Sequence, residues 1–201
     1  MNVPNTSEDL DATRRTPDEP RHTLQQGAIG LAGGLLGAFA MNQFARAVNA
    51  ANGGRESKGA APGHDRVGRG VQPPQAHGRA EEDAAVHVGT VAYRALAGHE
   101  PRASARPWLG SAAHYAFGGT MGVCYALLAD RAPLLRTGYG ALFGTLVWAI
   151  ADEGAMPALG LSRGPRQLPP GVHAFALAGH WVFGAALESV RRYGSRALQP
   201  A

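Results

Sequence analysis

The sequence predicts an all-α integral membrane protein: a four-helix bundle with one interfacial amphipathic helix and a disordered N-terminal tail. Three observations indicate this class. Four apolar segments each approach the ~20 residues that cross a hydrocarbon core at about 1.5 Å per residue. Most Lys, Arg, Asp and Glu residues lie between or outside these segments. Glycine, which is commoner in membrane helices than in soluble ones, supplies 28 of the 201 residues.

The predicted elements alternate between apolar and polar segments along the chain. They are a tail at 1–23, membrane helices at 24–45, 108–130, 138–161 and 172–190, a flexible linker at 46–79, an amphipathic helix at 80–98 and a C-terminal tail at 191–201. The linker is predicted from its Gly, Pro and charge content. The helix at 80–98 has acids in its first turn and apolar residues at helical spacing, while Arg94 makes it too polar to span. We expect it to lie on the membrane surface or against the bundle.

Two other interpretations of the apolar segments are less favoured. A soluble bundle of buried helices would leave little amphipathic surface to face water, because the four segments carry few charges. A cleavable signal peptide at the first segment is disfavoured because the preceding 23 residues carry five acids against three arginines. A signal peptide has a short basic region at that place.

Pairs of glycines four residues apart occur in three of the predicted spans. They are Gly33 and Gly37, Gly118 and Gly122, and Gly140 and Gly144. Lipid provides no hydrophobic drive between helices, so close association depends on small residues that let backbones approach. The three pairs therefore predict a tightly packed bundle.

The distribution of charge and cysteine limits the partners and the topology. One lysine and eighteen arginines give a pI of about 9.7, but the arginines are scattered, so we expect the lipid bilayer and no nucleic acid as partner. The short segments on the side of the termini are richer in arginine, so the positive-inside rule places both termini in the cytoplasm. The single cysteine, Cys124, excludes a disulfide framework or a Cys-based zinc site within one chain.

Polar side chains of four antiparallel spans fall at a similar depth, near the side opposite the termini. The predicted cluster consists of Asn42, His114, Asp152, Glu153, His173 and His180. His180 lies about 10 Å deeper than His173 on the same helix face. Because Asp152 and Glu153 are adjacent, an α-helix would turn them about 100° apart. We expect Asp152 to face inward and Glu153 to extend along an oilier stripe toward the interface.

Several interpretations of this cluster remain open. The simplest is a purely structural role, in which interhelical hydrogen bonds fix the packing of the helices. The more specific one is an ion or proton site, because intramembrane ionisable residues usually mark pathways or relays. A metal site is not expected, because no helix carries a close pair of ligands at metal-binding spacing. No catalytic residue, enzymatic activity or cofactor is expected, since no nucleophile is paired with a base. At the opposite side, Asp130 and Glu188 beside arginines predict charge pairing at the interface.

Three stretches resemble the YagU-type family of bacterial inner-membrane proteins, a domain of unknown function. They are HYAFGGTMG (114–122), WAIADEGAMPALGLSRGP (148–165) and HAFALAGHWVFGAALESVRR (173–192). The resemblance implies a multi-helix protein of the bacterial inner membrane, and it implies no reaction or ligand. It also places a set of polar and special residues on family motifs, namely His114, Asp152, Glu153, Pro157, His180 and Glu188.

Two functions follow from these predictions. The first is a small multi-pass membrane protein, structural or linked to acid stress, whose cluster packs the helices and responds to pH. The alternative is a proton- or ion-coupled transporter or channel component. We expect the alternative to require a homo-oligomer, because four short helices enclose little volume.

Overall fold

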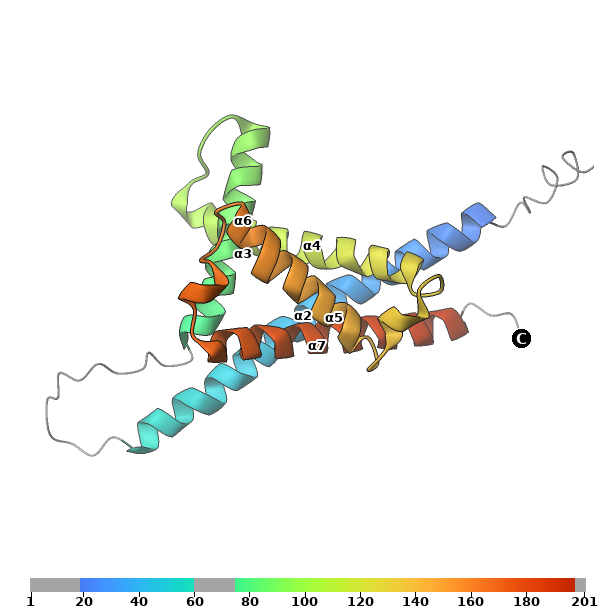
Figure 1. The fold of residues 1–201 in the computed structure, drawn as a ribbon. Helices are drawn as coiled ribbons and strands as arrows, with labels where there is room; N and C mark the ends of the chain where they lie inside the picture. The colour runs from blue at the N-terminus through green and yellow to red at the C-terminus, as the bar shows by residue number, and fades with distance from the viewer. Residues whose placement is uncertain (1–18, 60–74, 198–201) are drawn as a thin grey trace, which may run out of the picture.

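The computed structural model describes residues 19–59 and 75–197 as an assembly of helices with no strand in these two ranges (Figure 1). The elements are α2 (Glu19–Gly59), α3 (Gln75–Ala97), η1 (Ala103–Ala105), α4 (Arg106–Leu128), η2 (Pro133–Arg136), α5 (Ala141–Val147), η3 (Trp148–Ala155), α6 (Met156–Ala158), η4 (Pro165–Gln167) and α7 (Pro170–Ala197). The all-α prediction is confirmed for this part of the chain. The predicted disordered tail lies largely outside it.

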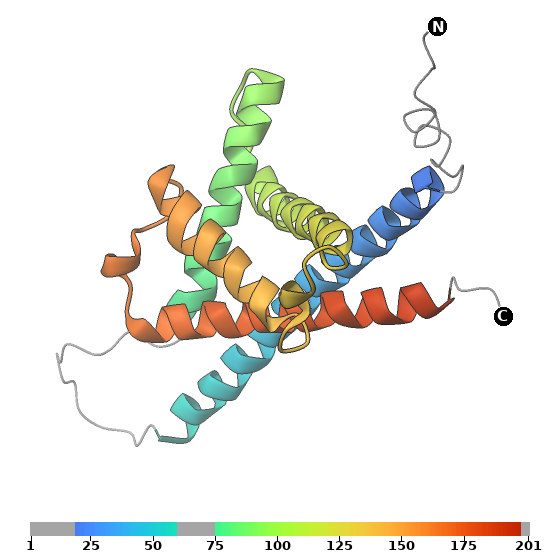
Figure 2. The ribbon, with the colours of Figure 1, turned by 45° about the vertical axis from the view of Figure 1, so that its right-hand side comes forward.

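Helix α2 runs obliquely across α4 and α7, and α3 lies steeply to these helices at one end (Figures 1 and 2). Helix α2 packs most extensively against α4 and α7, and α3 packs against α4. The start of α2 and the end of α7 lie at the same end of the bundle, which we call the termini side (Figure 1). Helices α3 and α6 lie at the opposite end, which we call the far side.

Several helix boundaries differ from the prediction, among them the end of α7, which continues to Ala197 instead of ending at residue 190. Helix α2 continues to Gly59 instead of ending at residue 45, and α3 begins at Gln75 instead of residue 80. The first part of the predicted linker is therefore helical. Its central part, residues 60–74, lies outside the described residues. Alanine and arginine, which favour helices, recur just after residue 45 and explain the extension of α2 there.

Within residues 19–59 and 75–197, one helix, over Arg21–Ala51, is long and apolar enough by itself to cross a membrane. The predicted four-span bundle is therefore not established by helix length and hydropathy. The third predicted span is divided among α5, η3 and α6. Helices α4 and α7 are long enough, but their glycines and polar residues such as His114 and His180 lower their mean hydropathy.

Glycines bring the helix backbones into direct contact, as the sequence predicts. A Cβ atom added at Gly34 would overlap the carbonyl oxygen of Gly118, and one at Gly122 would overlap that of Gly30. The α5–α7 contact is similar, because a Cβ atom at Gly144 would overlap the carbonyl oxygen of His180. Only glycine permits these approaches, so both interfaces depend on it.

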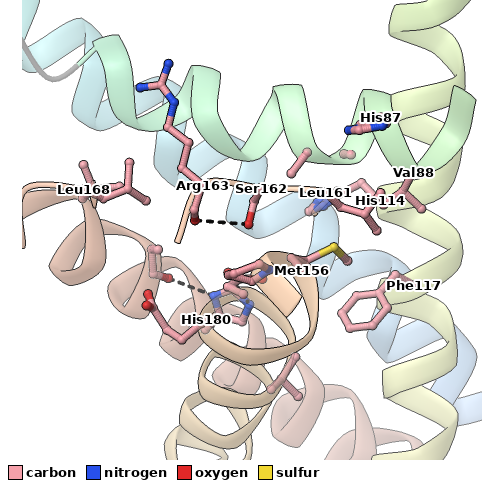
Figure 3. Close-up of a pocket in the computed structure, with 18 of the residues that line it drawn as sticks. His87, Val88, His114, Phe117, Met156, Leu161, Ser162, Arg163, Leu168 and His180 are labelled. Atoms are coloured by element: carbon pink, nitrogen blue, oxygen red, sulfur yellow. Dashed lines mark hydrogen bonds and ion pairs between the residues drawn. The ribbon is translucent and has the colours of Figure 1, made fainter. Parts of the chain in front are cut away.

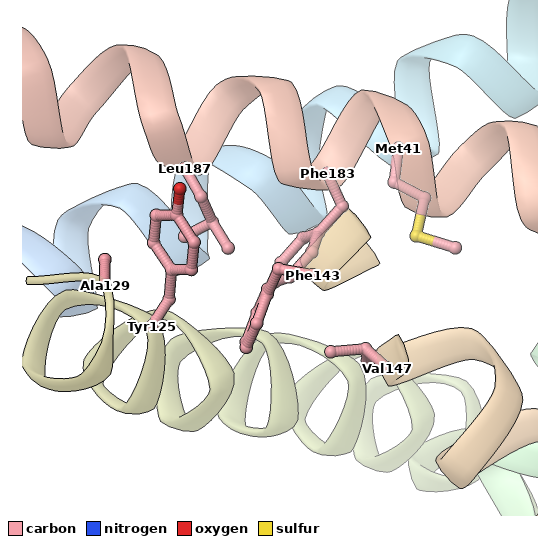
Figure 4. Close-up of a cluster of buried hydrophobic side chains, with 7 residues drawn as sticks. All are labelled: Met41, Tyr125, Ala129, Phe143, Val147, Phe183 and Leu187. Carbon is pink, nitrogen blue, oxygen red and sulfur yellow. The ribbon is translucent and has the colours of Figure 1, made fainter. Parts of the chain in front are cut away.

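A cluster of buried apolar side chains lies between the termini side and the far side (Figure 4). Its members come from α2, α4, α5 and α7 and from the residue after α4: Met41, Tyr125, Ala129, Phe143, Val147, Phe183 and Leu187. Tyr125 and Phe143 contact each other with ring centroids 4.8 Å apart. Figure 4 places Met41 at one end of the cluster and Ala129 at the other, so this apolar layer separates the polar groups of the two sides.

Candidate functional site

A cavity of about 1130 Å³ lies on the far side of the apolar layer, between α2, α3, α4, the η3–α6 segment, the loop at 160–168 and α7. Its inner wall includes Met41, Val147 and Phe183 of the apolar layer. Figure 3 shows His114, Met156, Leu161 and His180 around the hollow, with α3 along one side. The titratable and charged residues that line it are His87, His114, Asp152, Glu153, Arg163, His173 and His180.

The first carboxylate–imidazole pair joins η3 to the start of α7. Nδ1 of His173 lies 2.5 Å from Oε1 of Glu153, and Nε2 of His173 lies 3.0 Å from the carbonyl oxygen of Pro165. A carbonyl and an ionised carboxylate only accept hydrogen bonds, so both ring nitrogens donate when Glu153 is ionised. His173 is then an imidazolium paired with the Glu153 carboxylate. The His173–Glu153 pair therefore carries one proton more than a neutral histidine beside an ionised glutamate would.

The second pair lies deeper and is looser. Nδ1 of His180 lies 2.9 Å from the carbonyl oxygen of Ala176, to which it must donate. Nε2 of the same ring lies 3.6 Å from Oδ2 of Asp152, and the His180 side chain is only 7% exposed. In a neutral His180, Nε2 is a lone pair that faces another acceptor. If one proton binds between Nε2 of His180 and Oδ2 of Asp152, the two atoms can form a charge-assisted hydrogen bond.

The π-helix η3 explains how two adjacent carboxylates reach one cavity. The backbone N–H of Met156 bonds the carbonyl of Ala151, five residues earlier, which widens the turn and reduces the rotation between neighbouring side chains. The prediction that Glu153 extends outward to the interface is therefore wrong. Its side chain is 22% exposed, lines the cavity and pairs with His173. Asp152 faces the cavity as expected.

The other predicted cluster residues lie in two different surroundings. His114 lines the cavity, and its Nε2 lies 3.4 Å from the carbonyl oxygen of Ala38 on α2. Asn42 donates to the hydroxyl of Tyr115 at 3.4 Å and is not among the cavity-lining residues. The structure thus brings five of the six residues to one cavity, and Asn42 forms a separate α2–α4 contact.

A second polar cluster lies on the termini side of the apolar layer and involves the predicted interface charges. Glu188 has no exposed surface and accepts hydrogen bonds from Tyr125 at 2.7 Å, Arg191 at 2.8 Å and Arg192 at 2.6 Å. It raises the pKa of the Arg191 guanidinium by hydrogen bonding to it. Asp130 is about half exposed and pairs with Arg191 at 3.4 Å.

Asp130 and Glu188 both pair with arginines, whereas the complete burial of Glu188 is not evident from the sequence. Glu188 has three strong donors around it, which offsets the cost of removing a carboxylate from water. Its two arginine partners, Arg191 and Arg192, follow it at helical spacings of three and four residues, which is a signal that sequence reasoning can use.

Sequence reasoning also missed two parts of the cavity wall. Helix α3 supplies Ala84, Ala85, His87 and Val88, so the amphipathic helix closes one side of the site. The helical spacing of its apolar residues was the available signal. Arg163 lies in the loop after α6, where no pattern points inward. In the described ranges, no group of three or more His, Cys, Asp or Glu residues could hold a metal ion.

A comparison with protein-family models matches residues 73–189 to the family described as "Protein of unknown function (DUF1440)". The matched region includes all the cavity-lining elements except α2. No curated protein and no solved structure matches the chain.

Proposed function

We propose that this chain, which belongs to the DUF1440 family of proteins of unknown function, is a multi-pass protein of the bacterial inner membrane that binds protons in its far-side cavity. Proton binding at the two carboxylate–imidazole pairs would then adjust the packing of η3 against α7. The observation that carries the proposal is that these two pairs, built on consecutive residues of a π-helix, line one cavity.

Exposed apolar side chains support the multi-pass part of the proposal. Large hydrophobic residues are exposed on all the long helices of the bundle, including Leu36 and Phe39 on α2, Phe117 on α4, Ile150 on η3 and Trp181 on α7. Large contiguous apolar patches are rare on soluble monomers, and here large apolar side chains are exposed along several helices. Lipid solvates such surfaces, while the interior relies on glycine contacts, as in other membrane bundles.

The two pairs differ in the distance between the imidazole nitrogen and the carboxylate oxygen. The Glu153–His173 contact is short and already needs a proton, whereas the Asp152–His180 contact leaves two acceptors opposed. An imidazole exchanges protons near neutral pH, and a nearby carboxylate stabilises its charged form. Acidification should therefore close the Asp152–His180 gap first and draw η3 toward α7.

Proton uptake by the purified protein in lipid nanodiscs tests this function. Between pH 8 and pH 5 the wild type should take up about one more proton per chain than Asp152→Asn, because an amide does not titrate. Asp130→Asn is the matched control, since Asp130 pairs with arginines away from the cavity, and it should behave like the wild type. Identical uptake by all three proteins would refute proton binding at the cavity.

Membrane topology gives an independent test of the multi-pass proposal. Arginine-rich flanks on the termini side predict that both termini lie in the cytoplasm. Reporter fusions at each terminus should both report the cytoplasm, and a fusion in the 163–168 loop should report the periplasm. Opposite locations for the two termini would exclude an even number of spans.

A second candidate function is a component of a proton-coupled transporter. The size of the cavity and its apolar inner wall favour this candidate, since polar residues that only fix helix packing need no such space. The apolar layer between the two polar clusters would then be the barrier that opens during transport. An oligomer is not required by the cavity, which a single chain forms.

A further inference from the structure

We propose that the cavity binds a small monovalent organic ammonium ion, with its N–H groups between Asp152 and His180 and its apolar part against the surrounding helices. This proposal rests on the proposed function in one respect, because it uses the same Asp152–His180 pair. It adds a ligand class and predicts that the ligand and the proton compete.

The unfilled contact between Asp152 and His180 is the first argument. Because Nδ1 of His180 donates to Ala176, the Nε2 lone pair of a neutral ring faces Oδ2 of Asp152 at 3.6 Å. Both groups line the cavity, and the Asp152 side chain is 31% exposed, so a donor that enters the cavity can reach the gap. A nitrogen that carries two N–H groups can lie about 2.9 Å from both atoms and donate to each.

The charge balance of the cavity is the second argument. Titratable and charged groups face it from α3 (His87), α4 (His114), η3 (Asp152, Glu153), the loop after α6 (Arg163) and α7 (His173, His180), while α2 contributes Ala38 and Met41. The Glu153 charge is compensated by His173. The Arg163 side chain extends away from His180 toward α3 (Figure 3). Asp152 therefore remains as one negative charge, which matches a monovalent cation.

The nature of the walls favours an organic cation over a metal ion. Hard metal cations take six or more oxygen ligands, and here one of the two facing atoms is an imidazole nitrogen. The apolar lining includes Met41, Phe117, Val147 and Phe183. The cavity volume of about 1130 Å³ slightly exceeds the roughly 300–1,000 Å³ of sites that hold small organic molecules. An ammonium group on a short apolar body fits both the polar gap and these walls.

Competition with protons follows from the same geometry. A proton between Asp152 and His180 satisfies both acceptors and removes the negative charge that attracts the ammonium ion. The affinity for the cation should therefore fall as the pH is lowered from 8 to 5, the range in which imidazole titrates. A ligand held only by apolar contacts would show no such dependence.

Isothermal titration of the full chain in nanodiscs with n-butylammonium chloride tests the proposal. The wild type should bind n-butylammonium at least about tenfold more tightly than tetramethylammonium, which has no N–H donor, and Asp152→Asn should lose a similar factor. Asp130→Asn should bind like the wild type. Equal affinity for the two cations, or wild-type affinity in a folded Asp152→Asn variant, would overturn the proposal.

The comparison of the two cations uses only the wild type, so it remains decisive even if Asp152→Asn fails to fold. Proton uptake measured on the same preparations separates the two proposals. Uptake that depends on Asp152 without binding of n-butylammonium would reject the ligand and leave the proton site. Absence of both Asp152-dependent proton uptake and n-butylammonium binding would reject the two proposals together.

Discussion

Replacing Gly34 by alanine should destabilise the protein by about 3 kcal/mol, at the upper end of the usual cost of overpacking a core. The added Cβ atom would overlap the backbone carbonyl of Gly118 on α4. Backbone cannot move aside as a flexible side chain can, so α2 and α4 must separate along their length. The loss of stability is measured by thermal or denaturant unfolding in one detergent.

Gly27 provides a matched control on the same helix. A Cβ atom added there meets nothing within 4 Å, so Gly27→Ala should stabilise α2 by as much as about 1 kcal/mol through its higher helix propensity. The two substitutions are chemically identical, and their effects should have opposite signs. Equal effects would show that close α2–α4 backbone contact does not hold the bundle together.

Replacing Glu188 by alanine should cost about 3 kcal/mol, because it leaves the hydroxyl of Tyr125 and two guanidinium groups without their shared acceptor. The cost is near the lower limit for a broken buried pair, since the Arg192 side chain is 46% exposed and can be hydrated. Glu188→Gln should lose less, because the amide oxygen still accepts hydrogen bonds. Both values come from unfolding in the same detergent.

Asp130→Ala is the control for Glu188, since it removes a carboxylate from the same cluster. The Asp130 side chain is 52% exposed, and exposed ion pairs contribute only about 0–1 kcal/mol. Glu188→Ala should therefore be clearly the more damaging substitution. A loss for Asp130→Ala as large as that for Glu188→Ala would contradict the assignment of Glu188 as the centre of the cluster.

The sequence predicts the number of long helices and the depth of the polar cluster because both depend on counting residues along regular helices. His114, Asp152, Glu153, His173 and His180 meet in one cavity for this reason. The glycine contacts are predicted for a similar reason, although their partners are not: Gly33 and Gly37 face α7, while Gly30 and Gly34 face α4.

The orientation of Glu153 could not be predicted because it depends on a local change of helix type. An α-helical wheel turns Asp152 and Glu153 apart, whereas the wider turn of η3 places both in the cavity. No residue type in this segment specifies a π-helix uniquely. The complete burial of Glu188 depends on the positions of Tyr125 and Arg191 in three dimensions, which a single helix pattern does not contain.

The central claim, that the cavity holds a proton between a carboxylate and an imidazole, is tested most directly by nitrogen-15 NMR of histidine-labelled protein in lipid bilayers at neutral pH. The His173 ring should carry protons on both nitrogens, because it lies between the Glu153 carboxylate and the Pro165 carbonyl. In Glu153→Gln the amide can donate to Nδ1, so the ring should keep only its Nε2 proton. A neutral His173 ring in the wild type, unchanged by Glu153→Gln, would contradict proton binding at this pair.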